Sequence, residues 1–475
     1  MYPKLELFLD GEWASGSGRD SQPVINPATG ASLGELPHAT DADLDRALAA
    51  AERAYKPWRA VSGYERSKIL RRAAALIRER RNHIATVLTL EEGKTLAESL
   101  SEVDSSADII EWAAEEARRT YGRVIPGRTP TVRQMMIQEP VGPVAVFTPW
   151  NFPMTTPARK VSSALAAGCT VIMKAAEETP GTAVELVRAF QEAGCPAGTL
   201  NLVFGVPSHI SDRLISSPVI RKISFTGSVP VGKLLTKAAA DGMKRVTMEL
   251  GGHSPVLVFA DADPVAAART LAVGKYRNAG QVCIAPTRFY VHESIEKPFT
   301  ESFVEATKAL KVGDGMDSAS TMGPLANPRR VEAMERFVAD AEQRGAEILT
   351  GGKSGSNQGF FYQPTVIRNA PDNSLLMTEE PFGPLAPITP FSAFDEALTK
   401  ANSLPFGLAS YIFTASTETA LAASDGLEAG MVAVNSLGLG LVETPFGGVK
   451  DSGYGQEGGT EGLEAFTVKK FVSLM

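Results

Sequence analysis

Cys283 is the residue whose surroundings best suit nucleophilic chemistry. It lies in the segment 278–286 (NAGQVCIAP), where a glycine permits close approach at the boundary between an expected helix and an expected strand. A cysteine thiolate attacks electrophilic carbon, whereas a lone cysteine is more often a small buried hydrophobic residue. Both interpretations stay open at this point. We take the other two cysteines, Cys169 and Cys195, as structural.

Glu249 and Asn151 are candidates for polar partners of such a nucleophile. Glu249 stands in the segment 248–252 (MELGG) at the carboxyl end of an expected strand, where a carboxylate can act as a general base through one water molecule. Asn151 stands in the segment 149–153 (PWNFP). Its amide can donate to a developing oxyanion, a role worth about 3 kcal/mol in other enzymes. The alternatives are a solvated turn acid for Glu249 and an Asx turn before proline for Asn151.

Residues that follow two expected strands indicate a dinucleotide site. The segment 225–228 (FTGS) with Gly232 ends a strand and opens a helix, so a phosphate could bind at the helix N-terminus. Lys174 and Glu177 follow another strand and could contact ribose hydroxyls. The five His and three Cys residues show no close ligand spacing, so we predict no metal site.

Short apolar segments alternate with helical segments in the middle of the chain. We expect strands at 141–147, 170–173, 200–204, 220–225 and 245–248, and helices at 159–167, 182–192, 208–216 and 231–240. This alternation predicts a parallel, doubly wound α/β sheet that binds ligands at the carboxyl ends of its strands. Amphipathic helices are expected earlier, at 41–58, 64–90 and 95–120. A second α/β region follows Gly252, with a helix at 263–278, a strand at 288–292 and a helix at 295–310.

The composition excludes several classes of protein. The 475 residues include 47 Lys and Arg against 54 Asp and Glu, a net charge of −7, so we expect no nucleic-acid partner. With 44% hydrophobic and 21% charged residues, the chain is not disordered. We find no secretory pattern and no apolar run near the roughly 18 residues that span a membrane. Three cysteines suit a reducing compartment, so we expect a cytoplasmic protein with no membrane partner.

Taken together, these motifs resemble the aldehyde dehydrogenase superfamily along essentially the whole chain. Besides the segments above, the resemblance includes an opening FLDGEW and later NPATG, EPFGP and PFGGVKDSG segments, all in family order. The matching segments are 8–13, 26–30, 149–153, 174–180, 225–232, 249–252, 280–283, 380–384 and 445–453.

The resemblance implies a role for each matched residue. Cys283 matches the nucleophile that attacks the aldehyde, and Asn151 and the Cys283 N–H match the oxyanion hole. After hydride transfer to the nicotinamide, Glu249 matches the base that activates the hydrolytic water.

The resemblance also implies the cofactor contacts. Lys174 and Glu380 match ribose contacts and Phe382 a nicotinamide contact. Gly227 and Ser228 match the phosphate region, and Trp150 lines the cofactor pocket. The Glu177 carboxylate would repel a 2′-phosphate, so we expect NAD rather than NADP.

The implied architecture has three parts. A Rossmann-like NAD-binding domain would comprise 1–120 and 139–250, and an α/β catalytic domain 251–450. A small β oligomerisation domain would comprise 121–138 and 451–475. Such chains resemble homodimers or homotetramers.

Two arginines suggest the substrate. Arg159 and Arg277 match positions that bind the carboxylate in succinate-semialdehyde dehydrogenases, and a planar guanidinium suits that group. Alternatively, each could cap a helix or pair with a neighbouring acid. Leu441 replaces a serine of that subfamily, and Ala285 a second cysteine that some members carry, so the pocket could accept a longer or aromatic aldehyde.

Our leading hypothesis is therefore an NAD-dependent enzyme acting on a small-molecule aldehyde, a semialdehyde such as succinate semialdehyde. The alternative is a general or aromatic aldehyde dehydrogenase. A CoA-acylating enzyme is disfavoured because Glu249 would hydrolyse the thioester. A catalytically inactive structural homologue is disfavoured because Cys283, Asn151 and Glu249 occur together.

Overall fold

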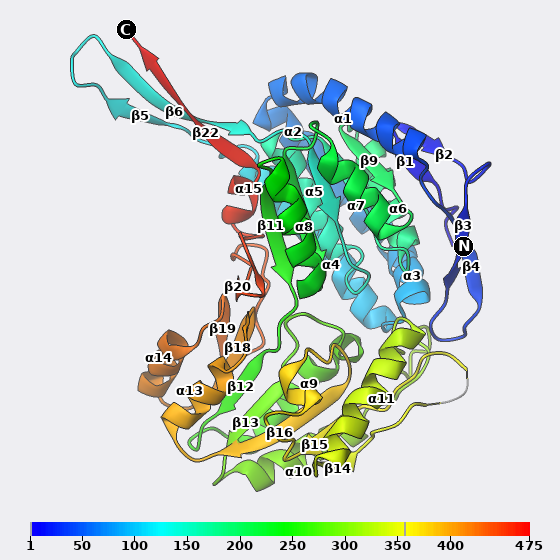
Figure 1. The fold of residues 1–475 in the computed structure, drawn as a ribbon, viewed down its shortest axis with the longest axis vertical. Helices are drawn as coiled ribbons and strands as arrows, with labels where there is room; N and C mark the ends of the chain where they lie inside the picture. The colour runs from blue at the N-terminus through cyan, green and yellow to red at the C-terminus, as the bar shows by residue number, and fades with distance from the viewer. Residues whose placement is uncertain (1, 356–357) are drawn as a thin grey trace.

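An eight-stranded sheet forms the centre of the first domain, in the upper part of Figure 1. The computed structural model describes residues 2–355 and 358–475. In spatial order the strands are β2 (Glu12–Ala14), β1 (Leu7–Leu9), β9 (Leu200–Val203), β8 (Val171–Lys174), β7 (Val144–Phe147), β10 (Lys222–Gly227), β11 (Arg245–Leu250) and β21 (Gly453–Tyr454). The five strands from β9 to β11 are parallel, and the edge strands are antiparallel. The predicted doubly wound sheet is confirmed.

Helices surround this sheet and bury apolar side chains in its core. They are α1 (Asp41–Ala60), α2 (Gly63–Glu79), α3 (Arg81–Glu92), α4 (Leu96–Glu116), α5 (Thr155–Ala167), α6 (Pro180–Glu192), α7 (Pro207–Ser216) and α8 (Val229–Asp241). Helices α1, α5, α6 and α8 lie directly against the strands, and α2, α3 and α4 pack on α5 and α6. The single helix expected at 64–90 is wrong, because the chain breaks at Arg80 into α2 and α3. Both halves bury an apolar stripe, so apolar spacing alone does not reveal the break.

A second sheet forms the lower domain of Figure 1. Its spatial order is β14 (Glu347–Thr350), β15 (Thr365–Arg368), β16 (Leu385–Phe391), β13 (Arg288–His292), β12 (Pro255–Val258), β18 (Ala409–Phe413) and β19 (Met431–Val434), all parallel except β14. Its helices are α9 (Pro264–Tyr276), α10 (Glu296–Lys308), α11 (Pro328–Gln343), α12 (Leu375–Thr378), α13 (Phe394–Asn402) and α14 (Thr417–Gly426). The short strand β12 was not among the expected elements.

Three antiparallel strands project from the first domain as an arm that carries the C-terminus (Figure 1). They are β5 (Arg123–Pro126), β6 (Arg133–Pro140) and β22 (Thr467–Leu474). The expected boundary at 451 is too early, because β21 joins the large sheet and α15 (Glu461–Glu464) lies against α5. Gly453 makes this possible. Its φ is +111°, and a Cβ there would lie 1.9 Å from the Met248 carbonyl oxygen.

Two small pairs of strands complete the fold. The hairpin β3 (Ser21–Ile25) and β4 (Ser32–Pro37) lies beside the first domain, and its turn reaches the second. There the Phe360 N–H donates to the Pro27 carbonyl at 2.8 Å. The strands β17 (Phe406–Gly407) and β20 (Val449–Lys450) pair near the end of the second domain. Among the described residues, no helix is long and apolar enough to cross a bilayer.

The close approach at Gly453 gives a stability prediction. Gly453→Ala places a methyl group against the Met248 carbonyl in a strained backbone conformation, and we expect it to cost more than about 2 kcal/mol. Gly18→Ala is the matched control, because Gly18 also has a positive φ (+75°) but has open space around it. Thermal melting of both variants measures the difference. Equal shifts in Tm would show that β21 adapts to a side chain.

Candidate active site

A cavity of about 760 Å³ lies between the two domains. The first domain lines it with the residues that end β10 and β11 and with the loop after β7. The chain leaves β7 toward β8 but returns to place β10 on the other side of β7, so the loops at this point diverge and open a crevice. The second domain closes the crevice with the loops around Cys283 and Glu380.

The structure brings nearly all the predicted site residues together. The cavity is lined by Trp150, Asn151, Arg159, Gly227, Ser228, Glu249, Arg277, Cys283, Glu380 and Phe382. Lys174 and Glu177 do not line it. They form an ion pair with each other after the end of β8, one strand further along the same sheet edge.

Asn151 is held in the loop between β7 and α5 by contacts across the domain boundary. Its side-chain Nδ2 donates to the Gln281 carbonyl at 3.0 Å, and its own carbonyl accepts from Lys94 Nζ at 2.7 Å and Asn278 Nδ2 at 3.0 Å. The side chain is buried. The Asn151 amide is therefore fixed two residues from Cys283 along the opposing loop, as an oxyanion donor requires.

Cys283 follows a tight turn that ends α9. In the short helix η1 (Arg277–Gly280), Asn278 and Ala279 have φ values of +49° and +51°, which non-glycine residues rarely adopt. Gly280 has φ +75°, and a Cβ there would lie 2.2 Å from the Gly383 carbonyl oxygen. Such strain persists only where surrounding contacts fix the backbone. Here it turns the half-buried Cys283 into the cavity.

Burial dominates the electrostatics of the reactive groups. Burial, with a smaller contribution from the Glu457 charge, raises the pKa of Glu249 to about 7. Burial also raises the pKa of the Cys283 thiol well above its usual value, and the neighbouring Glu249 raises it further by charge and hydrogen bonding. Both side chains line the cavity, and the pKa of Glu249 suits a base that exchanges protons near neutral pH.

Sequence reasoning missed several charged residues at the site. Glu457 lines the cavity and forms a buried ion pair with Lys160 of α5, nearly 300 residues away in sequence. Lys94, Glu98 and Glu102 line it from the turn before α4 and its first turns. No local pattern marks these residues. The capping box Thr95–Glu98 was the only readable signal that the α4 N-terminus lies here.

The two predicted substrate arginines face the cavity without an acid within ion-pair distance among the described residues. The Arg159 guanidinium lies 4.7 Å from the Phe446 ring centroid, and one nitrogen donates to the Gly440 carbonyl at 3.4 Å. Arg277 lies 5.4 Å from the Phe152 ring centroid. Buried Arg159 Nε has no partner. The alternative in which each arginine pairs with a neighbouring acid does not describe this structure.

The cavity wall near these arginines is largely apolar. Phe152, Ile284, Leu439 and Phe446 line it, while Leu441 is 56% exposed just beyond Gly440. This wall can pack against a hydrocarbon or ring between the reacting carbon and a distal anion.

The opposite part of the cavity fits a dinucleotide. Ser228 is the N-cap of α8 but makes no side-chain cap bond, so the first amides of the helix have no side-chain acceptor and can receive a phosphate. Trp150 and Phe382 meet edge to face with ring centroids 5.6 Å apart. The Glu380 carboxylate accepts from the Gly252 N–H at 3.3 Å, and burial raises its pKa to about 8. The described residues contain no cluster placed to hold a metal ion.

Comparisons with known proteins find a family model and several similar proteins. The model of the "Aldehyde dehydrogenase family" matches residues 13–472. The chain is 47% identical to a putative 4-(hydroxymethyl)benzenesulfonate dehydrogenase, TsaD2, of Comamonas testosteroni, over 99% of this chain and 98% of the relative. It is 41% identical to 3-sulfolactaldehyde dehydrogenase of Pseudomonas putida, over 99% and 97%. It is 39% identical to succinate-semialdehyde dehydrogenase [NADP(+)] GabD of Escherichia coli, over 99% and 97%.

A solved structure has the same fold across the full chain. The NAD-dependent aldehyde dehydrogenase of Sinorhizobium meliloti superposes with a TM-score of 0.98 at 34% identity, covering 100% of this chain and 95% of that one.

The position of Glu249 predicts an effect on thiol reactivity. Because the Glu249 charge and hydrogen bond raise the pKa of Cys283, Glu249→Gln lowers that pKa and increases the thiolate fraction. We expect alkylation by iodoacetamide at pH 8 to become about fivefold faster or more. Glu249→Asp, which keeps the charge, is the control. Slower alkylation in Glu249→Gln would instead show that the carboxylate removes the thiol proton before attack.

Proposed function

This chain belongs to the aldehyde dehydrogenase family, and we propose that it oxidises an aldehyde with a distal carboxylate or sulfonate to the acid, using NAD. The observation that carries the proposal is the pair of cavity-lining guanidiniums, Arg159 and Arg277, that lack acid partners among the described residues. Arg159 is buried, whereas Arg277 is exposed. A buried cation without a counter-ion is costly, so a ligand anion that pairs with Arg159 gains affinity.

The names of the relatives support an anionic substrate. Two of those described above are named for compounds with a sulfonate, and GabD for succinate semialdehyde, which ends in a carboxylate. Both groups are planar or pyramidal arrays of oxygens that a guanidinium binds through paired hydrogen bonds. The apolar wall lies where the carbon skeleton between the two ends would pack.

The mechanism follows from the side chains in the cavity. The Cys283 thiolate attacks the aldehyde carbon, and the Asn151 amide and Cys283 N–H donate to the oxyanion. Bound NAD would supply the hydride acceptor at this stage, and loss of hydride from the carbon that carries the oxyanion would leave a thioester on Cys283. Glu249 then takes a proton from a water molecule that attacks the thioester, and its pKa near 7 suits this transfer.

NAD rather than NADP is the proposed cofactor because of Glu177. Its carboxylate pairs with Lys174 at the carboxyl end of β8, in the same sheet as the strand β10 that leads into α8, and there it could accept from ribose hydroxyls. The same negative charge repels a 2′-phosphate. The relative GabD is named as NADP-dependent, so the cofactor preference of each family member has to be measured.

We also propose that the projecting arm joins copies of the chain into a dimer or tetramer. Tyr121, Val124 and Phe471 of the arm are 70%, 70% and 61% exposed. The outer edges of β5 and of the longer strand β22 have no neighbouring strand among the described residues. A long strand edge with apolar side chains pairs readily with another chain.

An aldehyde without an anionic end is the second candidate, favoured by the apolar wall and Leu441.

We expect kcat/KM for succinate semialdehyde to exceed that for butanal by about a hundredfold or more, which is about 2.7 kcal/mol. The pair 4-formylbenzenesulfonate and benzaldehyde tests the same preference for aromatic substrates. Similar values within both pairs would establish the second candidate.

Removing one guanidinium tests the clamp itself. Arg277→Met should reduce the preference for the anionic member of each pair at least tenfold, with little change for the neutral member. Arg188→Met is the matched control, because Arg188 also lies 5.4 Å from an aromatic ring, that of Trp13, but outside the cavity. An unchanged preference in Arg277→Met would contradict the clamp.

The role of Glu177 predicts a change in cofactor choice. Glu177→Gln removes the negative charge, and we expect kcat/KM for NADP to rise about tenfold while that for NAD falls. Steady-state kinetics with both cofactors and one aldehyde measure the ratio. An unchanged ratio would show that Glu177 does not face the adenosine ribose.

A further inference from the structure

Lys94 is a lysine buried in the turn between α3 and α4, where its side chain is 2% exposed. Gly93, with φ +99°, ends α3, and Thr95 caps α4, so local sequence fixes this turn. A buried ammonium is costly unless all its hydrogens have partners. The partners of Lys94 therefore indicate what it does.

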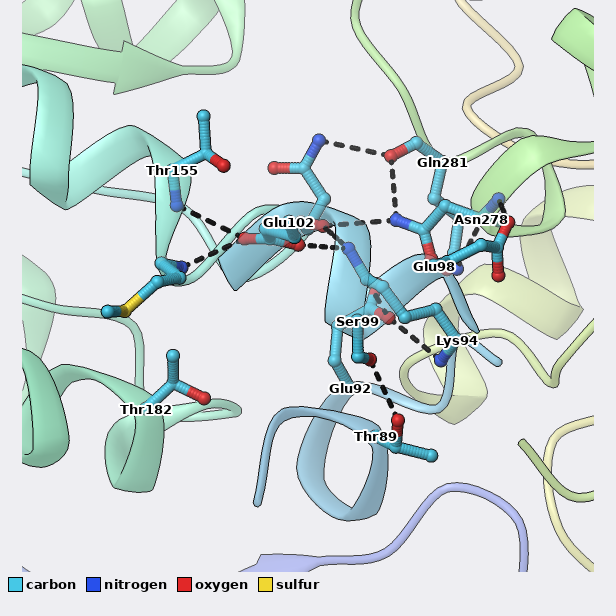
Figure 2. Close-up of polar contacts among 12 residues, drawn as sticks. Thr89, Glu92, Lys94, Glu98, Ser99, Glu102, Thr155, Thr182, Asn278 and Gln281 are labelled. Carbon is cyan, nitrogen blue, oxygen red and sulfur yellow. Dashed lines mark hydrogen bonds and ion pairs between the residues drawn. The ribbon is translucent and has the colours of Figure 1, made fainter. Parts of the chain in front are cut away.

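The Lys94 ammonium contacts four groups. Its Nζ donates to Glu102 Oε2 at 2.7 Å (Figure 2) and to the Asn151 carbonyl at 2.7 Å. It also lies 3.9 Å from Glu92 Oε2 and 4.1 Å from the Phe152 ring centroid. The Phe152 ring also contacts the Arg277 guanidinium, at 5.4 Å. One cation thus contacts the main chain of the predicted oxyanion donor and the ring beside a predicted substrate arginine.

Glu102 extends the effect of Lys94 to α5. Its other oxygen, Oε1, accepts from the Met154 and Thr155 N–H groups at 2.9 and 3.2 Å, as Figure 2 shows for Thr155. Met154 is the N-cap of α5 but has no side-chain cap bond, so Glu102 supplies the negative charge that this helix start favours. The helix α5 carries Arg159.

Asn278 joins the same group from the second domain. Its Nδ2 donates to the Asn151 carbonyl at 3.0 Å, and its N–H donates to Glu98 Oε1 at 2.7 Å. The Asn151 carbonyl therefore has two donors, Lys94 and Asn278, one from each domain. With its carbonyl held in this way, the Asn151 peptide cannot rotate without breaking both bonds.

We propose that Lys94 is a positioning residue that holds the Asn151 main chain so that its side-chain amide meets the oxyanion on Cys283. This proposal rests on the roles proposed above for Asn151 and Cys283. A displacement of about 1 Å at such a donor costs roughly a hundredfold in rate. The effect is expected in kcat, because the oxyanion forms only after the substrate binds.

The test uses hydrolysis of p-nitrophenyl acetate as well as aldehyde oxidation. Ester hydrolysis also forms an oxyanion, on the acyl carbon that the Cys283 sulfur attacks. The assay therefore does not depend on which aldehyde is the substrate. In both assays we expect Lys94→Met to lower kcat about 30- to 300-fold and to change KM less than about threefold. Assays well below each variant's melting temperature separate this loss from unfolding.

A double-mutant cycle separates positioning from general stabilisation. If Lys94 acts through Asn151, Lys94→Met lowers kcat by less than about twofold in an Asn151→Ala background. Glu102→Gln is the second variant if Lys94→Met does not fold. This substitution removes the charge that pairs with the Lys94 ammonium and keeps the shape of the side chain. We expect a kcat loss of about fivefold, which also disappears in the Asn151→Ala background.

Lys222→Met is the matched control. Lys222 is also a buried lysine, 1% exposed, but it bonds Thr247 and does not contact Asn151. We expect it to lower Tm and leave kcat within about threefold. The proposal would be overturned if the kcat losses of Lys94→Met and Asn151→Ala multiplied in the double variant. A kcat for Lys94→Met near that of wild type would also overturn it. A wild-type enzyme without ester hydrolysis or aldehyde oxidation would instead overturn the proposed roles of Cys283 and Asn151, and this inference with them.

Discussion

The hydrogen bond from the Asn151 amide to the Gln281 carbonyl is the constraint on which the site depends. It joins the loop after β7 to the loop before Cys283, and these loops belong to different domains. The proposed nucleophile, Cys283, and the proposed side-chain oxyanion donor, Asn151, therefore come from different domains. The cavity, the cofactor surface and the predicted anion clamp are all built around this contact, because each takes residues from both sides of it.

Burial explains why the charged residues of the site occur in groups. Glu249, Glu380 and Cys283 all have a raised pKa, and burial is the largest cause in each case. Burial also lowers the pKa of Arg159. Buried acids and cations interact more strongly with charge that develops during the reaction than exposed ones do, because the effective dielectric is lower. The buried Arg159 guanidinium, which lines the cavity, is available to the anion that we propose on the substrate.

Part of the backbone strain of the chain lies in the turn before Cys283. Asn278 and Ala279 adopt left-handed conformations, and Gly280 follows where no side chain fits. The Glu98 carboxylate and the Asn151 carbonyl bond Asn278 from the other domain and hold this turn in place. The stable packing of α4 and α5 thus supports a conformation that the local sequence disfavours.

The sequence by itself determined the doubly wound sheet, the family and the principal residues around Cys283, because strand alternation and short motifs are local properties. It did not reveal the break at Arg80 or the return of β21 to the first sheet, because both depend on distant packing. Only the tertiary structure decided that Glu457 pairs with Lys160, that Arg159 and Arg277 lack acid partners among the described residues, and that Lys94 holds Asn151. The Glu457–Lys160 and Lys94–Asn151 contacts join segments tens to hundreds of residues apart. Their physical reason is the cost of burying charge, which acts only after the chain has folded.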